Sequence, residues 1–239
     1  MMRKFKFIIQ LIRIALSVFY YGGKTLISPN RKKIDYFYNT AKKWGLSILR
    51  IAGVKLEIIG MENVNPNENY VFVSNHSSLF DIPVLQYALP CNFRIVYKRE
   101  LEKIPFFGYV LIKSPYIGIV REDSKDAIKG MKQAIEDFQK GISVLLFPEG
   151  TRSKDGKLQE FKRGAFMLAS KSQKPIVPVT IVGSNKILPK GYYSFEEGLV
   201  KVIIHQPVNM PKSGNKKDEL EIQNQVFNVI NKTLQEYKV

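Results

Sequence analysis

From Val54 onward, short runs rich in β-branched and aromatic residues alternate with longer stretches of helical periodicity. Runs such as Val144-Leu145-Leu146-Phe147 are apolar on both faces, as are strands buried between two layers of helices. This alternation restricts the chain to a layered α/β fold. The predicted strands are Lys55–Ile59, Tyr70–Ser74, Phe93–Tyr97, Tyr116–Val120, Ser143–Phe147, Ile176–Val182 and Val200–His205. The predicted helices are Leu79–Ala88, Ile104–Ile112, Lys125–Gln139, Ala165–Lys171 and Glu219–Glu236.

Residues 54–239 are therefore expected to form one α/β domain, with a central and mostly buried β-sheet flanked by helices. This stretch has no internal repeat and no low-complexity tract, and Lys212–Lys217 is the segment expected to form an exposed loop. In such sheets, ligand sites gather where strands end and helices begin. Polar clusters at those positions are the first candidates for function.

The first 53 residues are a different kind of segment, because they are basic and apolar and hold no acidic residue before Asp35. The apolar run Phe7–Tyr21 is fifteen residues long and contains Arg13. A helix that crosses a membrane needs about 20 apolar residues, so this run is expected to be too short to cross one. No small residues typical of a signal-peptide cleavage site follow the run.

A second amphipathic segment follows, since apolar residues recur at three- and four-residue spacing from Ile34 to Val54. We predict that residues 1–53 form a two-helix membrane-interface motif, with helices between about Lys4 and Ala52 that meet near Ser28-Pro29-Asn30. Its positive charge predicts a peripheral, monotopic placement on the cytoplasmic face of the cell inner membrane or plasma membrane. The alternative is that both helices cover the core of a soluble protein.

The charge balance narrows the choice of partners. Lys and Arg number 37 against 21 acidic residues, which gives a net charge of +16. Such a surplus suits an anionic membrane surface, a phosphorylated substrate, an acidic carrier protein or a nucleic acid. We expect no nucleic-acid partner, because the basic residues are spread along the chain without a basic–aromatic platform. The single cysteine, Cys91, excludes an internal disulfide, and with only His76 and His205 a structural zinc site is not expected.

The first polar cluster is Asn75-His76-Ser77-Ser78-Leu79-Phe80-Asp81, which follows a predicted strand. Five positions along a helix are a rotation of about 500°, so His76 and Asp81 can meet only if His76 precedes the helix and Asp81 lies in its first turn. A carboxylate on one ring nitrogen would then fix the tautomer and leave the other nitrogen basic, as a general base requires. The alternative is that Ser78 and Asp81 form a capping box and His76 is a turn residue.

Two further clusters also follow predicted strands. Lys98-Arg99 could bind an anion or form a charged turn, and Arg121 is placed similarly. The segment Phe147-Pro148-Glu149-Gly150-Thr151-Arg152-Ser153 ends a strand, then supplies a flexible glycine and a guanidinium suited to a phosphate. A nucleotide-binding loop is rejected, because five residues separate Gly150 from Gly156 and Leu158 stands where Ser or Thr is required.

Taken in order, these segments resemble the four motifs of the glycerolipid acyltransferase family, and most closely its bacterial 1-acyl-glycerol-3-phosphate acyltransferases. The matching segments are His-x-x-x-x-Asp at 76–81, Lys98–Gly108, Phe-Pro-Glu-Gly-Thr-Arg-Ser at 147–153 and Val-Pro-Val at 177–179. The resemblance covers roughly Lys55 to Val182 and implies an α/β domain with helices packed on a central sheet. The N-terminal helices also resemble the membrane-seating element of some bacterial members.

The resemblance implies transfer of a fatty acyl group from a thioester of acyl carrier protein or coenzyme A to the 2-hydroxyl of 1-acyl-glycerol-3-phosphate, which makes phosphatidic acid. It implies no metal and no cofactor beyond that co-substrate. Other acceptors, glycerol-3-phosphate or another lysophospholipid, stay open, as does a non-enzymatic role as a membrane surface protein that binds anionic lipid. In this scheme His76 is the general base and Asp81 orients it, while the acceptor is held by Lys98, Arg121, Glu149, Gly150, Thr151 and Arg152.

Overall fold

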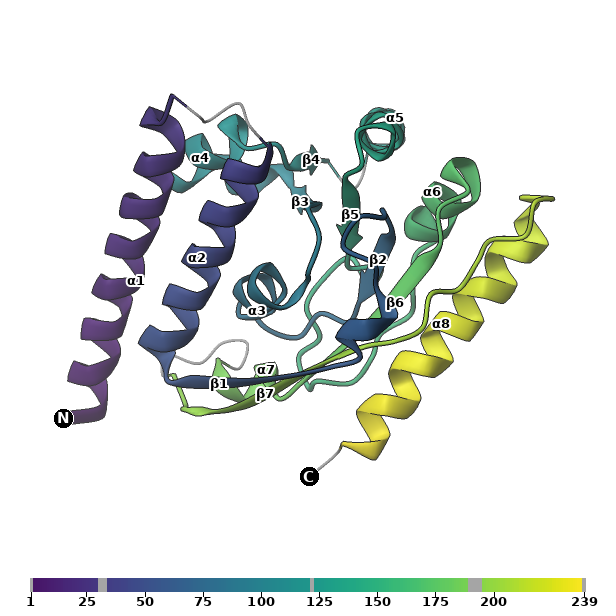
Figure 1. Cartoon of the computed structure of the whole chain (residues 1–239). Helices are drawn as coiled ribbons and strands as arrows, with labels where there is room; N and C mark the ends of the chain where they lie inside the picture. Colours follow the sequence, from purple (N-terminus) through teal and green to yellow (C-terminus); the bar gives the residue numbers. More distant parts are fainter. Residues whose placement is uncertain (1, 30–33, 121–122, 189–194, 238–239) are drawn as a thin grey trace.

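The computed structural model describes residues 2–29, 34–120, 123–188 and 195–237. Its centre is a seven-stranded sheet with the strand order β1-β7-β6-β2-β5-β3-β4 (Figure 1). The sheet confirms the seven predicted strands, with small shifts at their ends. Their bounds are β1 Val54–Ile59, β2 Val71–Ser74, β3 Phe93–Lys98, β4 Ile117–Ile119, β5 Ser143–Leu146, β6 Ile176–Val182 and β7 Gly198–Ile204.

The direction of the strands decides where a site can form. Strands β2, β3, β4, β5 and β6 all run parallel to one another. Strand β7 is antiparallel to β6 and parallel to β1. The carboxyl ends of five strands therefore meet at one edge of the sheet, which is where ligands bind in such folds. The segments that follow β2, β3, β4 and β5 contain the predicted polar clusters.

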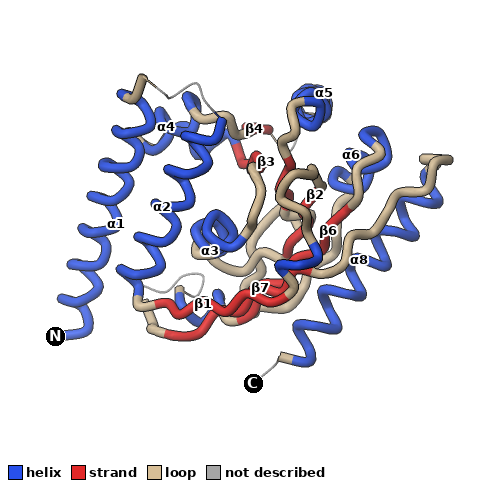
Figure 2. The backbone as a smooth tube through the Cα atoms, viewed as in Figure 1, coloured by secondary structure: helices blue, strands red, loops and turns tan. Residues whose placement is uncertain are grey.

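Helices form a layer on each face of the sheet (Figures 1 and 2). Alternate residues of the central strands point to opposite layers: Phe72 and Leu145 join the core cluster under α2 and α3, whereas Val71 and Val144 join the cluster under α5, α6 and α8. The layering confirms the predicted fold class. The helix bounds are α1 Met2–Ile27, α2 Ile34–Ala52, α3 Asp81–Ala88, α4 Phe107–Lys113, α5 Ser124–Gln139, α6 Gly164–Ser172, α7 Ser184–Ile187 and α8 Lys216–Glu236.

Two helix boundaries differ from the prediction, and one short helix is additional. The segment Ile104–Ile112 is helical only from Phe107, because a separate 3-10 turn, Arg99–Lys103, precedes it. The predicted loop Lys212–Lys217 is shorter, since Asn215 accepts the backbone N–H of Asp218 and caps α8 from Lys216 onward. The short helix α7 was not predicted, and four residues are too few to produce a helical periodicity.

The N-terminal segment forms the two predicted helices, which lie side by side (Figure 1). Gln10 donates to the carbonyl of Ile51 (3.1 Å) and Ser17 bonds Ser47 (3.1 Å), so α1 is fastened along α2. The helix α1 contains a stretch, Lys4–Ile27, that is long and apolar enough to cross a membrane. The expectation that this segment is too short to do so is therefore wrong, because the helix extends on both sides of the apolar run.

The inner face of α2 belongs to the same core as the sheet. Its buried residues Ile48, Leu49 and Ala52 pack in the cluster that also holds Phe72, whereas α1 lies outside them. The division of the chain into 1–53 and 54–239 stays a prediction, and the packing of α2 means that the two parts share one hydrophobic core.

Candidate active site

The loop between β2 and α3 holds a histidine–aspartate pair. Strand β2 ends at Ser74 and α3 begins at Asp81, so His76 precedes the helix and Asp81 is its first residue. The Nδ1 atom of His76 lies 2.7 Å from Oδ2 of Asp81. The same oxygen accepts the backbone N–H groups of Ser77 (2.7 Å) and Ser78 (2.8 Å). The geometry required by the sequence pattern is present. Of the alternative capping box only one half is present, since Asp81 accepts the backbone N–H of Ser78 whereas the Ser78 hydroxyl accepts from Phe80.

The two side chains of this pair differ in their exposure to solvent. Asp81 is fully buried and the His76 side chain is 15% exposed. An aspartate that accepts from Nδ1–H places the lone pair of the opposite nitrogen, Nε2, where it can take a proton. Among the described residues, no group is hydrogen-bonded to this Nε2. The ring therefore offers a base to a molecule outside the protein.

The segment after β5 holds His76 from three sides. Its Phe147 ring stacks on the imidazole, with centroids 4.1 Å apart. The Glu149 carboxylate accepts the backbone N–H of His76 (2.6 Å), and the backbone N–H of Ser153 donates to the His76 carbonyl (2.8 Å). Two of the predicted clusters, far apart in sequence, thus form one structure at the carboxyl edge of neighbouring strands.

Glu149 is a positioning residue by its contacts. It is 5% exposed, and its second oxygen accepts the backbone N–H (2.9 Å) and the side-chain amide (3.3 Å) of Gln159. Burial raises the pKa of the Glu149 carboxyl to about 7, although the N–H groups of Gln159 and His76 lower it in part. Both oxygens are occupied by protein groups, which supports a role in holding the loop over direct contact with a substrate.

The rest of this loop presents Gly150, Thr151 and Arg152. Gly150 has a positive φ of 75°, which glycine adopts at no steric cost, and a Cβ there would lie 3.1 Å from Nζ of Lys162. Thr151 is exposed and its carbonyl accepts from Gln159 (3.2 Å). Arg152 is half-buried and directly precedes Ser153, whose N–H holds His76. The loop therefore places the Arg152 guanidinium one residue before Ser153, the residue that bonds the His76 backbone.

The cations after β3 separate into two kinds. Arg99 donates to Asp126 (2.8 Å) and to the carbonyl of Gly118 (2.7 Å), so it fastens β4 and α5 to the end of β3. Among the described residues, Lys98 is paired with the half-buried Glu100 (3.1 Å), and it stays at the carboxyl edge of the sheet. Lys98 is thus better placed than Arg99 to meet a ligand. Arg121 lies outside the described residues.

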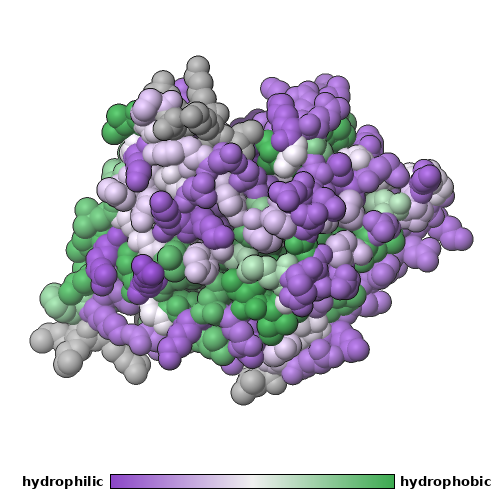
Figure 3. All heavy atoms as spheres, in the orientation of Figure 1, coloured by the Kyte–Doolittle hydropathy of each residue, from purple (hydrophilic) through white to green (hydrophobic). Residues whose placement is uncertain are grey.

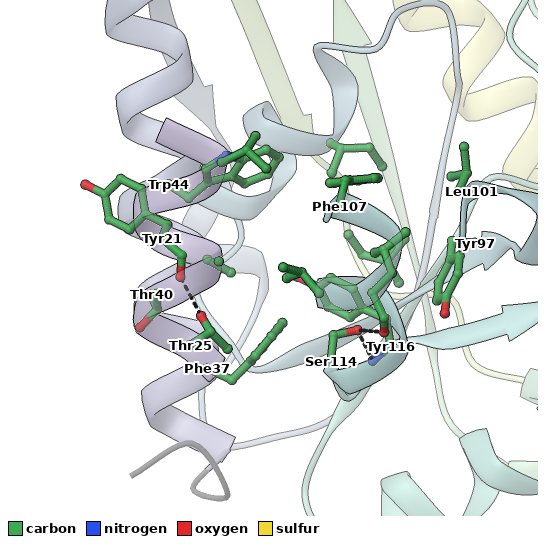
Figure 4. Close-up of a pocket in the computed structure, with 17 residues that line it drawn as sticks. Tyr21, Thr25, Phe37, Thr40, Trp44, Tyr97, Leu101, Phe107, Ser114 and Tyr116 are labelled. Atoms are coloured by element: carbon green, nitrogen blue, oxygen red, sulfur yellow. Dashed lines mark hydrogen bonds between the residues drawn. The ribbon is translucent and has the colours of Figure 1, made fainter. Parts of the chain in front are cut away.

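An apolar cavity of about 140 Å³ lies between the N-terminal helices and the α/β domain (Figure 4). Tyr21 and Trp44 line it from α1 and α2, and Phe107 and Tyr116 line it from the domain. Ile82, which directly follows Asp81, is also part of its wall. One wall residue of the cavity is therefore the direct sequence neighbour of Asp81.

Sequence analysis missed this cavity, Gln159 and Lys162. The cavity needs the packing of separate helices, which no local pattern encodes, and Gln159 lies in a segment without helical or strand periodicity. Lys162 had a weak signal, since Lys162-Arg163 places cations before the start of α6, where the helix dipole disfavours them. Within the described ranges, no group of three or more His, Cys, Asp or Glu side chains is arranged so that it could hold a metal ion.

A histidine held by a buried carboxylate, beside an arginine-bearing loop at the end of parallel strands, is an arrangement suited to general-base catalysis. The chain belongs to the acyltransferase family, whose sequence profile matches residues 55–182. The match spans all four predicted motifs and more than half of the chain.

Individual relatives agree with this assignment. A chloroplast 1-acyl-sn-glycerol-3-phosphate acyltransferase from Arabidopsis thaliana is 38% identical over 197 residues, which are 82% of this chain and 53% of the relative. One from Borreliella burgdorferi is 33% identical over 165 residues, 69% of this chain and 66% of the relative. This chain thus spans about half the length of the plant relative and about two thirds of the bacterial one.

A solved structure is similar over nearly its whole length. The crystal structure of the 1-acyl-sn-glycerophosphate acyltransferase PlsC from Thermotoga maritima matches with a TM-score of 0.82 and 28% identity, covering 98% of this chain and 95% of that one. Coverage of this extent includes the N-terminal helices as well as the α/β domain, and it confirms the overall fold.

Proposed function

We propose that the chain transfers a fatty acyl group from an acyl thioester to the 2-hydroxyl of 1-acyl-glycerol-3-phosphate and so makes phosphatidic acid. Its family and the names of its relatives support this acceptor. The single observation that carries the proposal is the 2.7 Å contact between His76 Nδ1 and the fully buried Asp81.

The proposed reaction is one direct transfer. Nε2 of His76 takes the proton of the acceptor hydroxyl while that oxygen attacks the thioester carbonyl carbon. The tetrahedral intermediate then expels the thiolate, which receives the proton from the imidazolium. Asp81 keeps the ring oriented and stabilises its positive charge. General-base help of this kind is worth about 10²–10⁴-fold, and positioning by the surrounding loops supplies a further share.

The acceptor phosphate is assigned to the loop after β5. Arg152 offers two parallel N–H donors, and Lys162 adds an ammonium group beside Gly150. Lys98 at the end of β3 is a third cation on the same edge of the sheet. Binding the phosphate here would hold the acceptor hydroxyl at a fixed distance from His76.

The fatty acyl chain is assigned to the apolar cavity. Its lining is aromatic and aliphatic, and it includes Ile82, which directly follows Asp81 in the chain. A chain lying there would leave its thioester carbonyl near His76. The donor is a thioester of acyl carrier protein or coenzyme A, and the net charge of +16 suits either anionic carrier.

The membrane side is assigned to α1. Large apolar side chains, among them Ile8, Ile12 and Leu16, are 53%, 54% and 61% exposed along this helix. Figure 3 shows hydrophobic side chains gathered over α1. Because α1 is fastened along α2, we propose that it lies against one leaflet, on the cytoplasmic face of the inner or plasma membrane.

The contact between the helices and the catalytic loop supports this placement. Phe7 of α1 packs against Phe195 (4.9 Å between centroids), which packs against Phe80 (5.5 Å) directly before Asp81. One short chain of rings thus joins the proposed membrane face to the catalytic loop. A lysolipid in that leaflet would have only a short path to His76.

The test is to incubate purified protein with each acyl donor and a panel of acceptors, and to measure the products by mass. The panel holds lysophosphatidate, glycerol-3-phosphate and lysophosphatidylcholine. Phosphatidate formed from lysophosphatidate, at a rate well above the other products, is the expected result. Preferential use of glycerol-3-phosphate or lysophosphatidylcholine would replace the proposed acceptor, and no acylated lipid with either donor would contradict the enzymatic function.

A further inference from the structure

A second groove lies away from the catalytic loop, where the first half of α1 meets the end of α2 and the turn at Gly53. Its volume is about 630 Å³. In Figure 1 this is the lower end of the helix pair, beside the start of β1. None of its lining residues belongs to the catalytic loop or to the apolar cavity described above.

The groove has an excess of positive charge. Arg13 of α1 and Arg50 of α2 line it, and among the described residues no carboxylate is paired with either guanidinium. Lys6 also lines it, but its ammonium is bonded to Glu197 (2.6 Å). Three cations and one acid leave a net charge of +2 in the groove. Two arginines on different helices thus face a common space, and the one carboxylate among its described lining residues, Glu197, is bonded to Lys6.

The same groove has an apolar wall. Phe5 and Ile9 of α1 line it and are 67% and 40% exposed, and Ile51 of α2 lines it from the other side. Gln10, whose amide donates to the Ile51 carbonyl, ties the two helices together within the groove. The wall continues onto the exposed apolar face of α1, at Ile8 and Ile12. Cationic and apolar surfaces therefore lie side by side, on two helices that the Gln10–Ile51 bond holds together.

We propose that this groove binds the phosphate of an anionic glycerophospholipid of the membrane, with the lipid's chains along Phe5 and Ile9. A guanidinium is the side chain best suited to a phosphate, and two of them can donate to its oxygens together. A free phosphate would gain nothing from the apolar wall, whereas a lipid uses both surfaces. The proposal rests on the membrane placement given to α1 in the proposed function.

Such a lipid would lock the helix pair at one depth and orientation. Its phosphate would reduce the repulsion between two like charges across the interface of α1 and α2. Its chains would extend the apolar face of α1 into the leaflet. Because α2 contributes Ile48 and Leu49 to the core of the domain, holding the helix pair also holds the α/β domain at the membrane.

The experiment measures lipid binding to the full chain in neutral detergent by native mass spectrometry. The probe is phosphatidylglycerol with eight-carbon chains, compared with the matching phosphatidylcholine and with inorganic phosphate. Arg13→Ala/Arg50→Ala is the test variant. Lys4→Ala/Lys43→Ala is the matched control, since it removes the same charge from exposed positions of the same two helices outside the groove.

We expect phosphatidylglycerol to bind the parent more tightly than phosphatidylcholine or phosphate, and the arginine variant to lose at least about 10-fold in affinity. The lysine variant should lose less than about 3-fold. Equal losses in both variants would show a diffuse charge effect and overturn the proposal, as would equal binding of phosphatidylcholine. Phosphate binding as tight as that of the lipid would overturn it too.

Circular dichroism of both variants confirms that each is folded before binding is compared. The measurement needs no turnover, so its failure leaves the acyl transfer untouched. Conversely, an inactive chain that still bound phosphatidylglycerol through the two arginines would contradict only the proposed reaction.

Discussion

The catalytic edge of the sheet and the N-terminal helix pair partition polarity in opposite ways. At the edge, the charged groups are inside: Asp81 is fully buried with three hydrogen-bond donors on one oxygen, and Glu149 is 5% exposed. On α1 the apolar groups are outside, with Leu16 61% exposed. Neither region is fully suited to an aqueous environment. The first needs a preorganised, low-dielectric site and the second needs an apolar solvent.

The contrast indicates that the catalytic edge controls turnover and that α1 controls membrane binding. A change at the catalytic edge should lower turnover and leave membrane binding intact. A change on the outer face of α1 should move the protein off the membrane and leave the catalytic geometry intact. Mutations should therefore be able to change turnover and membrane binding separately.

The largest effect is expected for His76→Ala. Removal of the base should lower kcat by about 10²–10⁴-fold, because no other described side chain is hydrogen-bonded to Asp81 in its place. His205→Gln is the matched control, since that second histidine bonds only Thr180 among the described residues. Phosphatidate formation and vesicle co-sedimentation are measured together. A loss of membrane binding in His76→Ala would break the separation.

Arg152→Ala tests the acceptor side of the same edge. Loss of a charge-assisted contact to a phosphate is worth about 1.5–3 kcal/mol, so kcat/KM for lysophosphatidate should fall by about 10–100-fold. The variant Lys154→Ala removes an exposed cation two residues away and should change little. Steady-state kinetics with varied lysophosphatidate checks this. Equal kcat/KM in Arg152→Ala and Lys154→Ala would remove Arg152 from the site.

Leu16→Asn tests the helix pair. An exposed leucine that enters a leaflet contributes about 1.5–3 kcal/mol, so its loss should weaken vesicle binding by roughly 10-fold or more. Leu220→Asn on α8 is the control, because that leucine is 54% exposed but lies on the opposite helix layer. Binding is measured by co-sedimentation. Activity toward lysolipid in detergent micelles should stay at the parent level, and a drop there would show that the two regions are coupled.

Glu149 should also make the free energy of unfolding depend on pH. Its raised pKa means that the folded protein keeps this proton between pH 4.5 and about 7, while the unfolded chain loses it. The free energy of unfolding should therefore fall as pH rises through that window, by about 3 kcal/mol from this group. Glu149→Gln should flatten that slope, whereas Glu221→Gln at an exposed position should keep it. Urea unfolding at several pH values measures both, and an unchanged slope in Glu149→Gln would contradict the assignment.

Much of the fold follows from the sequence because buried strands leave an apolar signature in the chain itself. The run Ser143–Phe147 is an example, since Val144 and Leu145 face opposite cores and both are apolar. The pairing of His76 with Asp81 was also predictable, as it depends only on where α3 begins.

Contacts between separate elements were not predictable. The clamp of Glu149 and Ser153 on His76 joins segments more than 70 residues apart. The lining of the apolar cavity comes from four α-helices, a strand, a 3-10 turn and the loop after α4. The choice between Lys98 and Arg99 likewise needed Gly118, in the next strand, and Asp126, in the helix after it. Local pattern does not encode such partners, because they depend on how the layers pack.

The most direct test of the catalytic pair is a double-mutant cycle in phosphatidate formation, with His76→Ala, Asp81→Asn and the combined variant. Near-UV circular dichroism first establishes that all three are folded. If Asp81 acts only through the imidazole, the combined variant should be as slow as His76→Ala alone. Parent-level turnover in Asp81→Asn, or two losses that simply add, would contradict a histidine base held by a buried carboxylate.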